Sequence, residues 1–243
     1  MSKKQKEIWK VYNNVFDQFT FRTLEKLRSK GLIDELKSTI SLGKEANIFT
    51  AQRGSDVVCL KIYRLQSCDF NKMYEYIRSD PRFSELQHQR RKIIFAWSQR
   101  EYRNLMKVRE AGVNAPTVYG YVDHVLVMEF IGDAQESRAA PLLKDLIPEH
   151  TEKFFGKVVK NMQLLWKHKL VHGDLSHYNI LNHNEEPVLI DFSHGTTSEA
   201  PNFRELWIRD CTTIANYFAK LGVKIDAAEL YKVVTGKKLS SMA

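Results

Sequence analysis

The chain has 243 residues, 43% hydrophobic and 27% charged, so it is long enough to bury a core as one two-lobed domain or two small ones. It has no apolar run of membrane length and opens on MSKKQKE without a signal-peptide core, so we expect a cytoplasmic protein without membrane contact. Its three cysteines have no paired ligand spacing, which argues against a disulfide framework and structural zinc. The net charge of +8 favours polyanionic partners such as RNA, with a solvated basic surface as the alternative.

The first segment, about residues 4–36, predicts two or three short helices. Its apolar residues recur at helical spacing: Ile8, Val11, Val15, Phe19, Leu24 and Leu27. Such a stripe most often packs against a neighbouring element, and the alternative is a nucleic-acid-reading helix-turn-helix over residues 23–36.

Residues 39–64 alternate in character around two turns and predict three successive strands. The polar stretch 66–92 follows, with a break at Asp80-Pro81, and we expect a flexible loop there. This loop has three candidate uses: a nucleotide cover, an RNA contact or a plain connection. A helix over residues 96–111 ends at Gly112.

Residues 115–130 predict two more strands, and the apolar run Val125–Met128 indicates a buried one. Beyond Gly132 the pattern is helical, over 148–168, over 203–221, and in a last helix that begins with a capping box of Asp226 and Glu229. Strands followed by helices predict an α+β fold with two lobes. We expect a helical extension at 1–38, an N-lobe at 39–131 and a helical C-lobe at 132–243.

Lys61 and Glu101 form the first candidate pair of functional residues. Lys61 lies on an apolar strand, and Glu101 interrupts an apolar helix face that also carries Trp97, Leu105 and Val108. A carboxylate directed into a core is costly unless it is paired. Lys61 with Glu101 resembles the strand-lysine and helix-glutamate ion pair of kinases, so we predict an ion pair between them. The alternative places Glu101 at the edge of the stripe, in contact with solvent.

The run 172–181, HGDLSHYNIL, and the strand ending at Asp191 resemble the catalytic and metal-binding segments of protein kinases. Phosphoryl transfer requires phosphates and Mg²⁺ held in place while a carboxylate orients the attacking group. Asp174 is the candidate base, and Asn179 and Asp191 are the candidate Mg²⁺ ligands. The alternative is that these are unrelated loop residues. We expect His172 to be a packed structural histidine.

The segment 41–49, SLGKEANIF, lies where kinases carry their glycine-rich loop. Ser41 and Ala46 occupy the outer glycine positions and Gly43 is the only glycine, so backbone can approach phosphates less freely than in a full glycine loop. Ser41 and Lys44 are candidate phosphate contacts. An ordinary hairpin turn is the alternative.

Four departures from conventional protein kinases exclude a peptide-docking enzyme with an activation loop. No arginine precedes Asp174, Ser176 replaces the usual lysine, Ser193 replaces the last glycine of Asp-Phe-Gly, and few residues separate Asp191 from the helix at 203.

The segments SLGKEAN (41–47), HGDLSHYNIL (172–181) and IDFS (190–193) resemble the RIO family of atypical protein kinases, in its first subfamily and an archaeal-type minimal form. The resemblance covers nearly the whole chain, including TFRTL at 20–24 and Arg209-Asp210-Cys211. Leu42 stands where that subfamily usually has threonine, which puts a hydroxyl contact to phosphate there in doubt.

This resemblance implies a two-lobed kinase-like RIO domain whose truncated C-lobe lacks the activation loop and peptide platform. It implies an ATP and Mg²⁺ site, with Mn²⁺ as a second candidate ion, and a hinge that contacts adenine. The implied site residues are Lys61, Glu101, Asp174, Asn179 and Asp191, and the implied hinge residues are Met128, Glu129, Phe130 and Ile131.

The implied activity is that of a serine/threonine protein kinase and ATPase, with autophosphorylation and a phospho-aspartate at Asp191. The implied role is maturation of the small ribosomal subunit, with the precursor particle or its rRNA and a protein acceptor as partners, and no DNA.

Three rival functions are open on the sequence. Small-molecule phosphotransferases of the aminoglycoside or choline kinase type share the layout but carry a larger helical insert than residues 133–148 allow. A small kinase of the tRNA-modification complex usually ends soon after its metal aspartate. A catalytically idle RNA-binding assembly factor would have no need for the intact set of Lys61, Asp174, Asn179 and Asp191.

Overall fold

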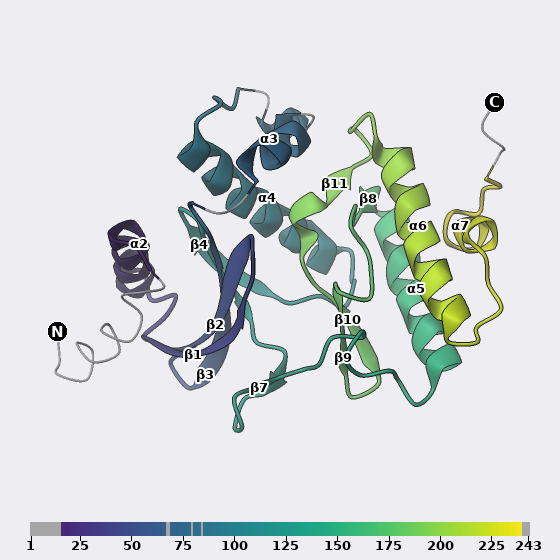
Figure 1. Cartoon of the computed structure of the whole chain (residues 1–243), viewed down its shortest axis with the longest axis horizontal. Coiled ribbons are helices and arrows are strands. Elements are labelled where there is room, and N and C mark those ends of the chain that lie inside the picture. The colour runs from purple at the N-terminus through teal and green to yellow at the C-terminus, as the bar shows by residue number, and fades with distance from the viewer. Residues whose placement is uncertain (1–15, 67–68, 79, 84, 240–243) are drawn as a thin grey trace.

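The computed structural model describes residues 16–66, 69–78, 80–83 and 85–239, and it has two lobes (Figure 1). A five-stranded sheet flanked by helices forms the N-lobe, and three helices with short strand pairs form the C-lobe. The long helix α4 (Arg90–Glu110) runs between them. The predicted α+β, two-lobed architecture is therefore confirmed.

The N-lobe sheet is antiparallel, with the strand order β1-β2-β3-β5-β4. Its strands are β1 (Glu35–Leu42), β2 (Ala46–Arg53), β3 (Asp56–Tyr63), β4 (Val118–Val122) and β5 (Val125–Glu129). The predicted three-strand meander is present and begins four residues before the expected start at Thr39. Strand β3 is buried on both faces from Val58 to Tyr63, because helices cover the sheet on each side.

Helix α2 (Gln18–Ser29) covers the outer face of this sheet. The Asp17 carboxylate caps it by accepting from the Thr20 N–H at 2.7 Å, and Leu24 and Leu27 pack on the sheet residues Phe49 and Leu60. The helix-turn-helix alternative is wrong, because after α2 the chain enters β1 at Glu35. The apolar residues Ile8, Val11 and Val15 lie outside the described residues.

The segment expected to be a flexible loop, 66–92, instead contains helix α3 (Phe70–Arg78) and a 3₁₀ turn, η1 (Pro81–Phe83). Helix α4 also begins at Arg90, six residues before the predicted start. The reason is tertiary packing: Met73 and Ile77 of α3 join Ile93, Ile94 and Trp97 of α4 in a buried cluster. The apolar residues of α3 find this partner, and the Asp69 carboxylate caps the helix by accepting from the Lys72 N–H at 3.1 Å.

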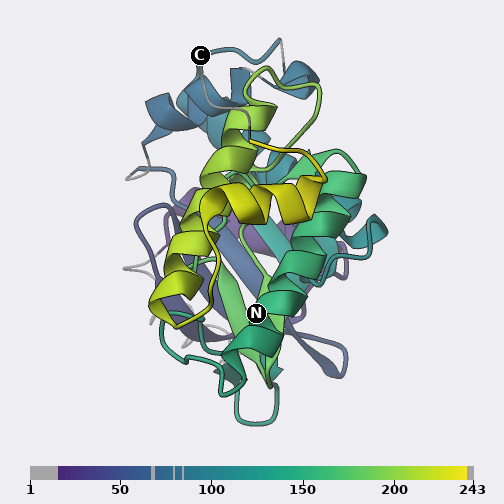
Figure 2. The same ribbon diagram turned by 90° about the vertical axis from the view of Figure 1, so that its right-hand side faces the viewer.

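The C-lobe is built on α5 (Thr151–Lys167), α6 (Phe203–Lys220) and α7 (Ala227–Thr235), and α7 crosses the other two (Figure 2). As predicted, Asp226 caps α7 by accepting from the Glu229 N–H at 2.8 Å. In the described part of the chain, no helix combines the length and hydrophobicity needed to cross a bilayer.

Short strand pairs hold the loops between the lobes and these helices. They are β6 (Gly132–Asp133) with β7 (Arg138–Ala139), β8 (Leu170–Val171) with β11 (Thr196–Thr197), and β9 (Ile180–His183) with β10 (Glu186–Leu189). The β8–β11 pair encloses the segment 172–195. This segment contains the candidate catalytic loop and the 3₁₀ turn η2 (Phe192–His194). Pairing at both ends therefore fixes this segment against the C-lobe core.

Candidate active site

The predicted ion pair between Lys61 and Glu101 is present and buried. Lys61 Nζ lies 2.9 Å from Glu101 Oε1, and the two side chains are 7% and 1% exposed. Strand β3 supplies the lysine, and the buried face of α4 supplies the glutamate. The alternative in which Glu101 reaches solvent is wrong.

Tyr63 completes the environment of Glu101, a role that was not predicted from the sequence. Its buried hydroxyl donates to Glu101 Oε2, so both carboxylate oxygens are bound. The signal was available, because Tyr63 follows Lys61 by two residues on a strand and so faces the same side. Burial raises the pKa of Glu101, and the negative charge of Asp191 adds to this, while Lys61 and Tyr63 act in the opposite direction.

We predict that Tyr63→Phe moves the acid limb of the pH–activity profile to higher pH. The Tyr63 hydroxyl stabilises the ionised form of Glu101, so its loss raises the pKa of that carboxyl further, and the pairing with Lys61 fails at a higher pH than in the wild type. Kinetics between pH 5 and 8 would measure the shift. An unchanged acid limb would contradict this role for Tyr63, and Tyr119→Phe, on an exposed tyrosine of β4, is the control.

Asp191 joins the same network from the C-lobe. Its Oδ1 lies 2.9 Å from Lys61 Nζ and accepts from the Ser193 hydroxyl at 2.6 Å. Burial alone would raise the pKa of Asp191, but Lys61 and Ser193 outweigh it and hold that pKa well below its usual value. The same two carboxylates, Asp191 and Glu101, raise the pKa of Lys61 against the effect of burial. Asp191 is therefore ionised at neutral pH and tied to the N-lobe.

The catalytic-loop candidates Asp174 and Asn179 lie together, next to the strand that ends at Asp191. Asn179 Nδ2 donates to the Asp174 carbonyl at 2.8 Å and to Asp174 Oδ2 at 3.2 Å. The Ile190 N–H donates to the Asn179 carbonyl at 3.0 Å, which places Asn179 beside Asp191 in space. Partial burial raises the pKa of Asp174, and the charge of Asp191 raises it further. The three side chains predicted from spacing are thus brought to one place.

Asp210 of α6 fixes the backbone around Asp174. Its buried carboxylate accepts from the Gly173 N–H at 2.8 Å and from the Leu175 N–H at 3.0 Å. Burial raises the pKa of Asp210 to about 7, whereas the two backbone donors favour its ionised form. Gly173 has φ +79°, and a Cβ there would lie 2.7 Å from the His194 carbonyl oxygen, so this position requires glycine. This positioning role of Asp210 was not predicted from the sequence.

His172 is a packed residue, as expected. Its ring is fully buried, Nε2 lies 2.9 Å from the Ile190 carbonyl, and burial lowers its pKa to about 4. A neutral imidazole in this place ties the strand before the catalytic loop to the strand before Asp191.

The donor set at Asp191 and Asn179 fits a hard divalent cation. Among the described residues, the hydrogen bonds and ion pairs of Asp191 all end on Oδ1, and those of the Asn179 amide use only Nδ2. One oxygen of each side chain therefore remains to accept a cation. The described residues hold no cluster of three or more histidine, cysteine or acidic side chains suited to a metal, so an ion here would share its shell with phosphate oxygens and water.

The predicted phosphate loop forms the turn between β1 and β2. The Gly43 N–H donates to the Ala46 carbonyl at 3.0 Å, with Ser41 at the end of β1 and Lys44 in the turn. Burial raises the pKa of Glu45, and the next largest effects come from the charges of Asp191 and Lys61. The turn therefore lies within electrostatic reach of the ion-pair network.

The predicted hinge follows the end of β5 and enters β6. Met128 and Glu129 close the strand, and Phe130 and Ile131 lead into Gly132. The Glu129 carboxylate accepts from the Thr117 N–H at 2.9 Å, and the Ile131 carbonyl accepts from the Ala140 N–H at 2.9 Å. These bonds fix the connection between the lobes beside β3.

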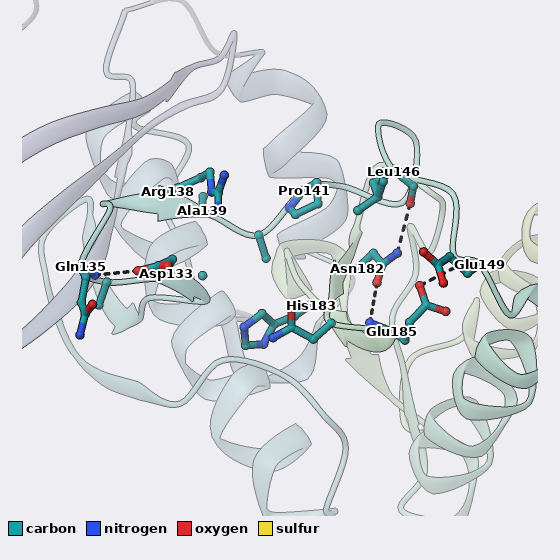
Figure 3. A pocket seen from close by; sticks show the side chains of 14 residues that line it. Asp133, Gln135, Arg138, Ala139, Pro141, Leu146, Glu149, Asn182, His183 and Glu185 are labelled. Carbon is teal, nitrogen blue, oxygen red and sulfur yellow. Dashed lines mark hydrogen bonds between the residues drawn. The ribbon is translucent and has the colours of Figure 1, made fainter.

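A cavity of about 870 Å³ opens beyond the hinge, between the β6–β7 turn and the β9–β10 hairpin (Figure 3). None of the predicted site residues lines it. Its buried amide, Asn182, is already satisfied: Nδ2 donates to the Leu146 carbonyl at 3.4 Å, and Oδ1 accepts from the Glu185 N–H at 3.0 Å. This cavity is therefore separate from the Lys61–Asp191 network.

A model of the RIO domain matches residues 47–230 of the chain. The chain is 41% identical to the RIO-type serine/threonine-protein kinase Rio1 of Methanocaldococcus jannaschii, over 95% of this chain and 79% of that protein. It is 38% identical to the protein of the same name from Haloferax volcanii, over 97% of this chain and 81% of that one.

Among solved structures, the chain is similar to the Rio2 kinase of Chaetomium thermophilum, described as an ADP/Mg²⁺-phosphoaspartate complex. The TM-score is 0.65 at 18% identity, and the match covers 88% of this chain and 66% of that one. At this identity the likeness shows the shared fold.

Proposed function

Because the chain belongs to the RIO family of serine/threonine protein kinases, we propose that it uses ATP and Mg²⁺ in the maturation of the small ribosomal subunit. The inferred resemblance to the first, archaeal-type subfamily is confirmed. In this proposal Lys61 holds the ATP phosphates, Asn179 and Asp191 hold Mg²⁺, Asp174 orients the acceptor, and residues 128–131 contact adenine.

The observation that carries this proposal is the chain of ion pairs from Glu101 through Lys61 to Asp191. Two carboxylates share one ammonium, so the network has a net negative charge, and the carboxylate of Asp174 adds to it. A divalent cation would neutralise this excess while it binds phosphate, which is the role Mg²⁺ plays in kinases.

We further propose that Asp191 accepts the γ-phosphoryl group transiently. The lowered pKa keeps its carboxylate ionised, and Oδ2 has no hydrogen-bond partner among the described residues. Attack by a carboxylate oxygen on the γ-phosphorus would break the bond to the β–γ bridging oxygen and release ADP, and water would then hydrolyse the acyl phosphate. The phosphoaspartate described for the Rio2 kinase of Chaetomium thermophilum is consistent with this step.

The short connection between the lobes and α5 favours a protein acceptor over a small molecule. Residues 132–150 hold only the β6–β7 pair and loops, with no helical insert to enclose a small acceptor. The chain's own serines and threonines are candidate acceptors.

The net charge of +8 supports contact with rRNA in the precursor particle and hence a cytoplasmic site of action.

We predict that the purified protein releases phosphate from γ-labelled ATP slowly and labels itself, and that chelation of Mg²⁺ stops both reactions.

The protein should also sediment with small-subunit precursors at low salt and dissociate as salt rises, because phosphate contacts release counterions. Gradient centrifugation at two salt concentrations measures this association. Absence from the precursor fractions at low salt would contradict the ribosomal role and leave the kinase activity unaffected.

A further inference from the structure

Asn104 of α4 connects the segment around Asp191 to the N-lobe and takes no direct part in the proposed chemistry. It lies one helical turn after Glu101, so the two side chains share a face of α4. Its amide is buried, with 4% of the residue exposed. Nδ2 donates to the Phe192 carbonyl at 2.8 Å and to the Gly195 carbonyl at 2.7 Å. Helix α4 therefore holds the turn at 192–195 directly, in addition to the path through Glu101 and Lys61.

The two carbonyls that Asn104 binds fix the turn that follows Asp191. Asp191 itself has φ +61°, in the left-handed region that residues with a Cβ adopt uncommonly and that aspartate tolerates better than most. Gly195 lies so close to the amide that a Cβ on it would come within 3.1 Å of Asn104 Nδ2. Any larger residue at 195 would push this amide away. Asn104 thus binds the backbone on the C-terminal side of Asp191 at two carbonyls.

The remaining atom of the amide, Asn104 Oδ1, is bound by the segment after α3. Arg82 Nη1 donates to it at 2.9 Å. The same guanidinium forms a bidentate ion pair with Asp80, with Nε 2.9 Å from Oδ1 and Nη2 2.5 Å from Oδ2. Arg100 also contacts this carboxylate, with its Nε 3.2 Å from Asp80 Oδ2. The planar guanidinium can make these contacts together because its donors point in fixed directions.

A second contact joins α3 to the same turn. The rings of Tyr76 and His194 meet edge to face with their centroids 4.8 Å apart. The segment 70–83, which the sequence predicted as part of a flexible loop, therefore touches both the side chain that holds the turn and the turn itself. These contacts connect the segment to the turn that follows Asp191.

We infer that Asn104 is a positioning residue for Asp191, and that Arg82 and Asp80 lock it, so that the order of residues 70–83 controls cation binding at Asp191. This inference rests on the proposed role of Asp191 as a cation ligand. Asn104 holds the turn through the Phe192 and Gly195 carbonyls, the turn fixes the direction of the Asp191 carboxylate, and Arg82 keeps the amide from rotating. Displacement of residues 70–83 leaves Asn104 free to turn away and loosens the site.

The test compares Asn104→Ala with Asn161→Ala. Asn161 is a matched control: it is a buried amide on α5 that accepts from the Asn114 N–H at 2.8 Å and donates to the Lys157 carbonyl at 3.0 Å, and neither of these bonds reaches Asp191 or the turn at 192–195. Mn²⁺ binding in the presence of adenosine 5′-(β,γ-imido)triphosphate, followed by electron paramagnetic resonance, reports the site without turnover. We expect Asn104→Ala to weaken Mn²⁺ by about 10-fold, the usual scale for loss of a group that orients a ligand, and Asn161→Ala to leave the affinity unchanged.

Arg82→Lys keeps a cation beside Asp80 but cannot also reach Asn104, and the Arg82 side chain is close enough to the surface for this variant to fold. We expect a smaller loss of Mn²⁺ affinity in the same direction. Without nucleotide or metal, amide hydrogen exchange over residues 192–197 should accelerate in Asn104→Ala and stay unchanged in Asn161→Ala.

Wild-type Mn²⁺ affinity in both Asn104→Ala and Arg82→Lys, with affinity lost in Asp191→Asn, would overturn the inference. Wild-type affinity in Asp191→Asn would instead overturn the proposed role of Asp191 itself. The two failures are therefore distinguishable within one experiment.

Discussion

Asp191→Asn is expected to reduce phosphate release from ATP by about 10³-fold or more, the scale on which enzymes lose activity when a nucleophile or its equivalent is removed. The amide that replaces the carboxylate has no negative charge to attack phosphorus and one oxygen fewer to bind a cation. Incubation of wild type and variant with γ-labelled ATP, followed by separation of the products, measures the effect. Acid-stable and acid-labile protein-bound phosphate should be resolved, because an acyl phosphate on aspartate is labile.

The loss should come from chemistry and not from misfolding. Asparagine tolerates the left-handed backbone that residue 191 adopts, and Lys61 keeps its partner Glu101 when the charge of Asp191 is removed. Asp123→Asn is the matched control, because Asp123 also has a left-handed backbone, at φ +53°, and also pairs with a lysine, Lys26, at 3.0 Å. We expect this control to retain full activity.

Equal phosphate release from wild type and Asp191→Asn would contradict the proposed mechanism as a whole. Absence of acid-labile protein-bound phosphate in the wild type, with phosphate release lost in Asp191→Asn, would contradict only the covalent step and leave Asp191 as a cation ligand. The experiment thus separates its two proposed roles.

The sequence allowed us to predict those parts of the site in which two side chains on recognisable helices, strands or loops contact each other. Glu101 lies on the apolar face of a helix, where a carboxylate requires a partner, and the resemblance to the kinase lysine–glutamate pair pointed to Lys61. The spacing of Asp174, Asn179 and Asp191 likewise needed only a resemblance to a known loop, and the structure brings the three together.

The residues that the sequence did not reveal act on backbone atoms of distant segments. Asn104 binds carbonyls 88 and 91 positions further along, and Asp210 binds amides 37 and 35 positions earlier. No periodicity or spacing rule marks such a partner, because a carbonyl or an N–H is present at nearly every residue. Helix α3 was missed for a different reason: its apolar residues Phe70, Met73, Tyr74 and Ile77 do recur at helical spacing, but the polar composition of residues 66–92 favoured a loop.

The second large effect is expected at Asp174, the proposed catalytic base. Asp174→Asn is expected to lower the rate of autophosphorylation by about 10²- to 10⁴-fold, the range that a positioned general base contributes. The raised pKa of Asp174 makes its carboxylate a stronger base than a fully solvated aspartate. It is therefore better able to take a proton from a serine or threonine hydroxyl. The affinity for ATP should stay within a few-fold of wild type, because Lys61 and Asp191 are untouched.

The kinetic pattern tests the role of Asp174 independently of the folding of the variant. A lowered kcat with an unchanged KM for ATP is expected for a group that acts only on the acceptor. Asp145→Asn serves as the control, since Asp145 is an exposed C-lobe aspartate whose salt-bridge partner is Lys144. Retention of full autophosphorylation in Asp174→Asn would contradict the assignment. A parallel rise in the KM for ATP would instead place Asp174 among the residues that hold the nucleotide. In that case the substitution would act through Asn179, the proposed cation ligand, which is hydrogen-bonded to Asp174.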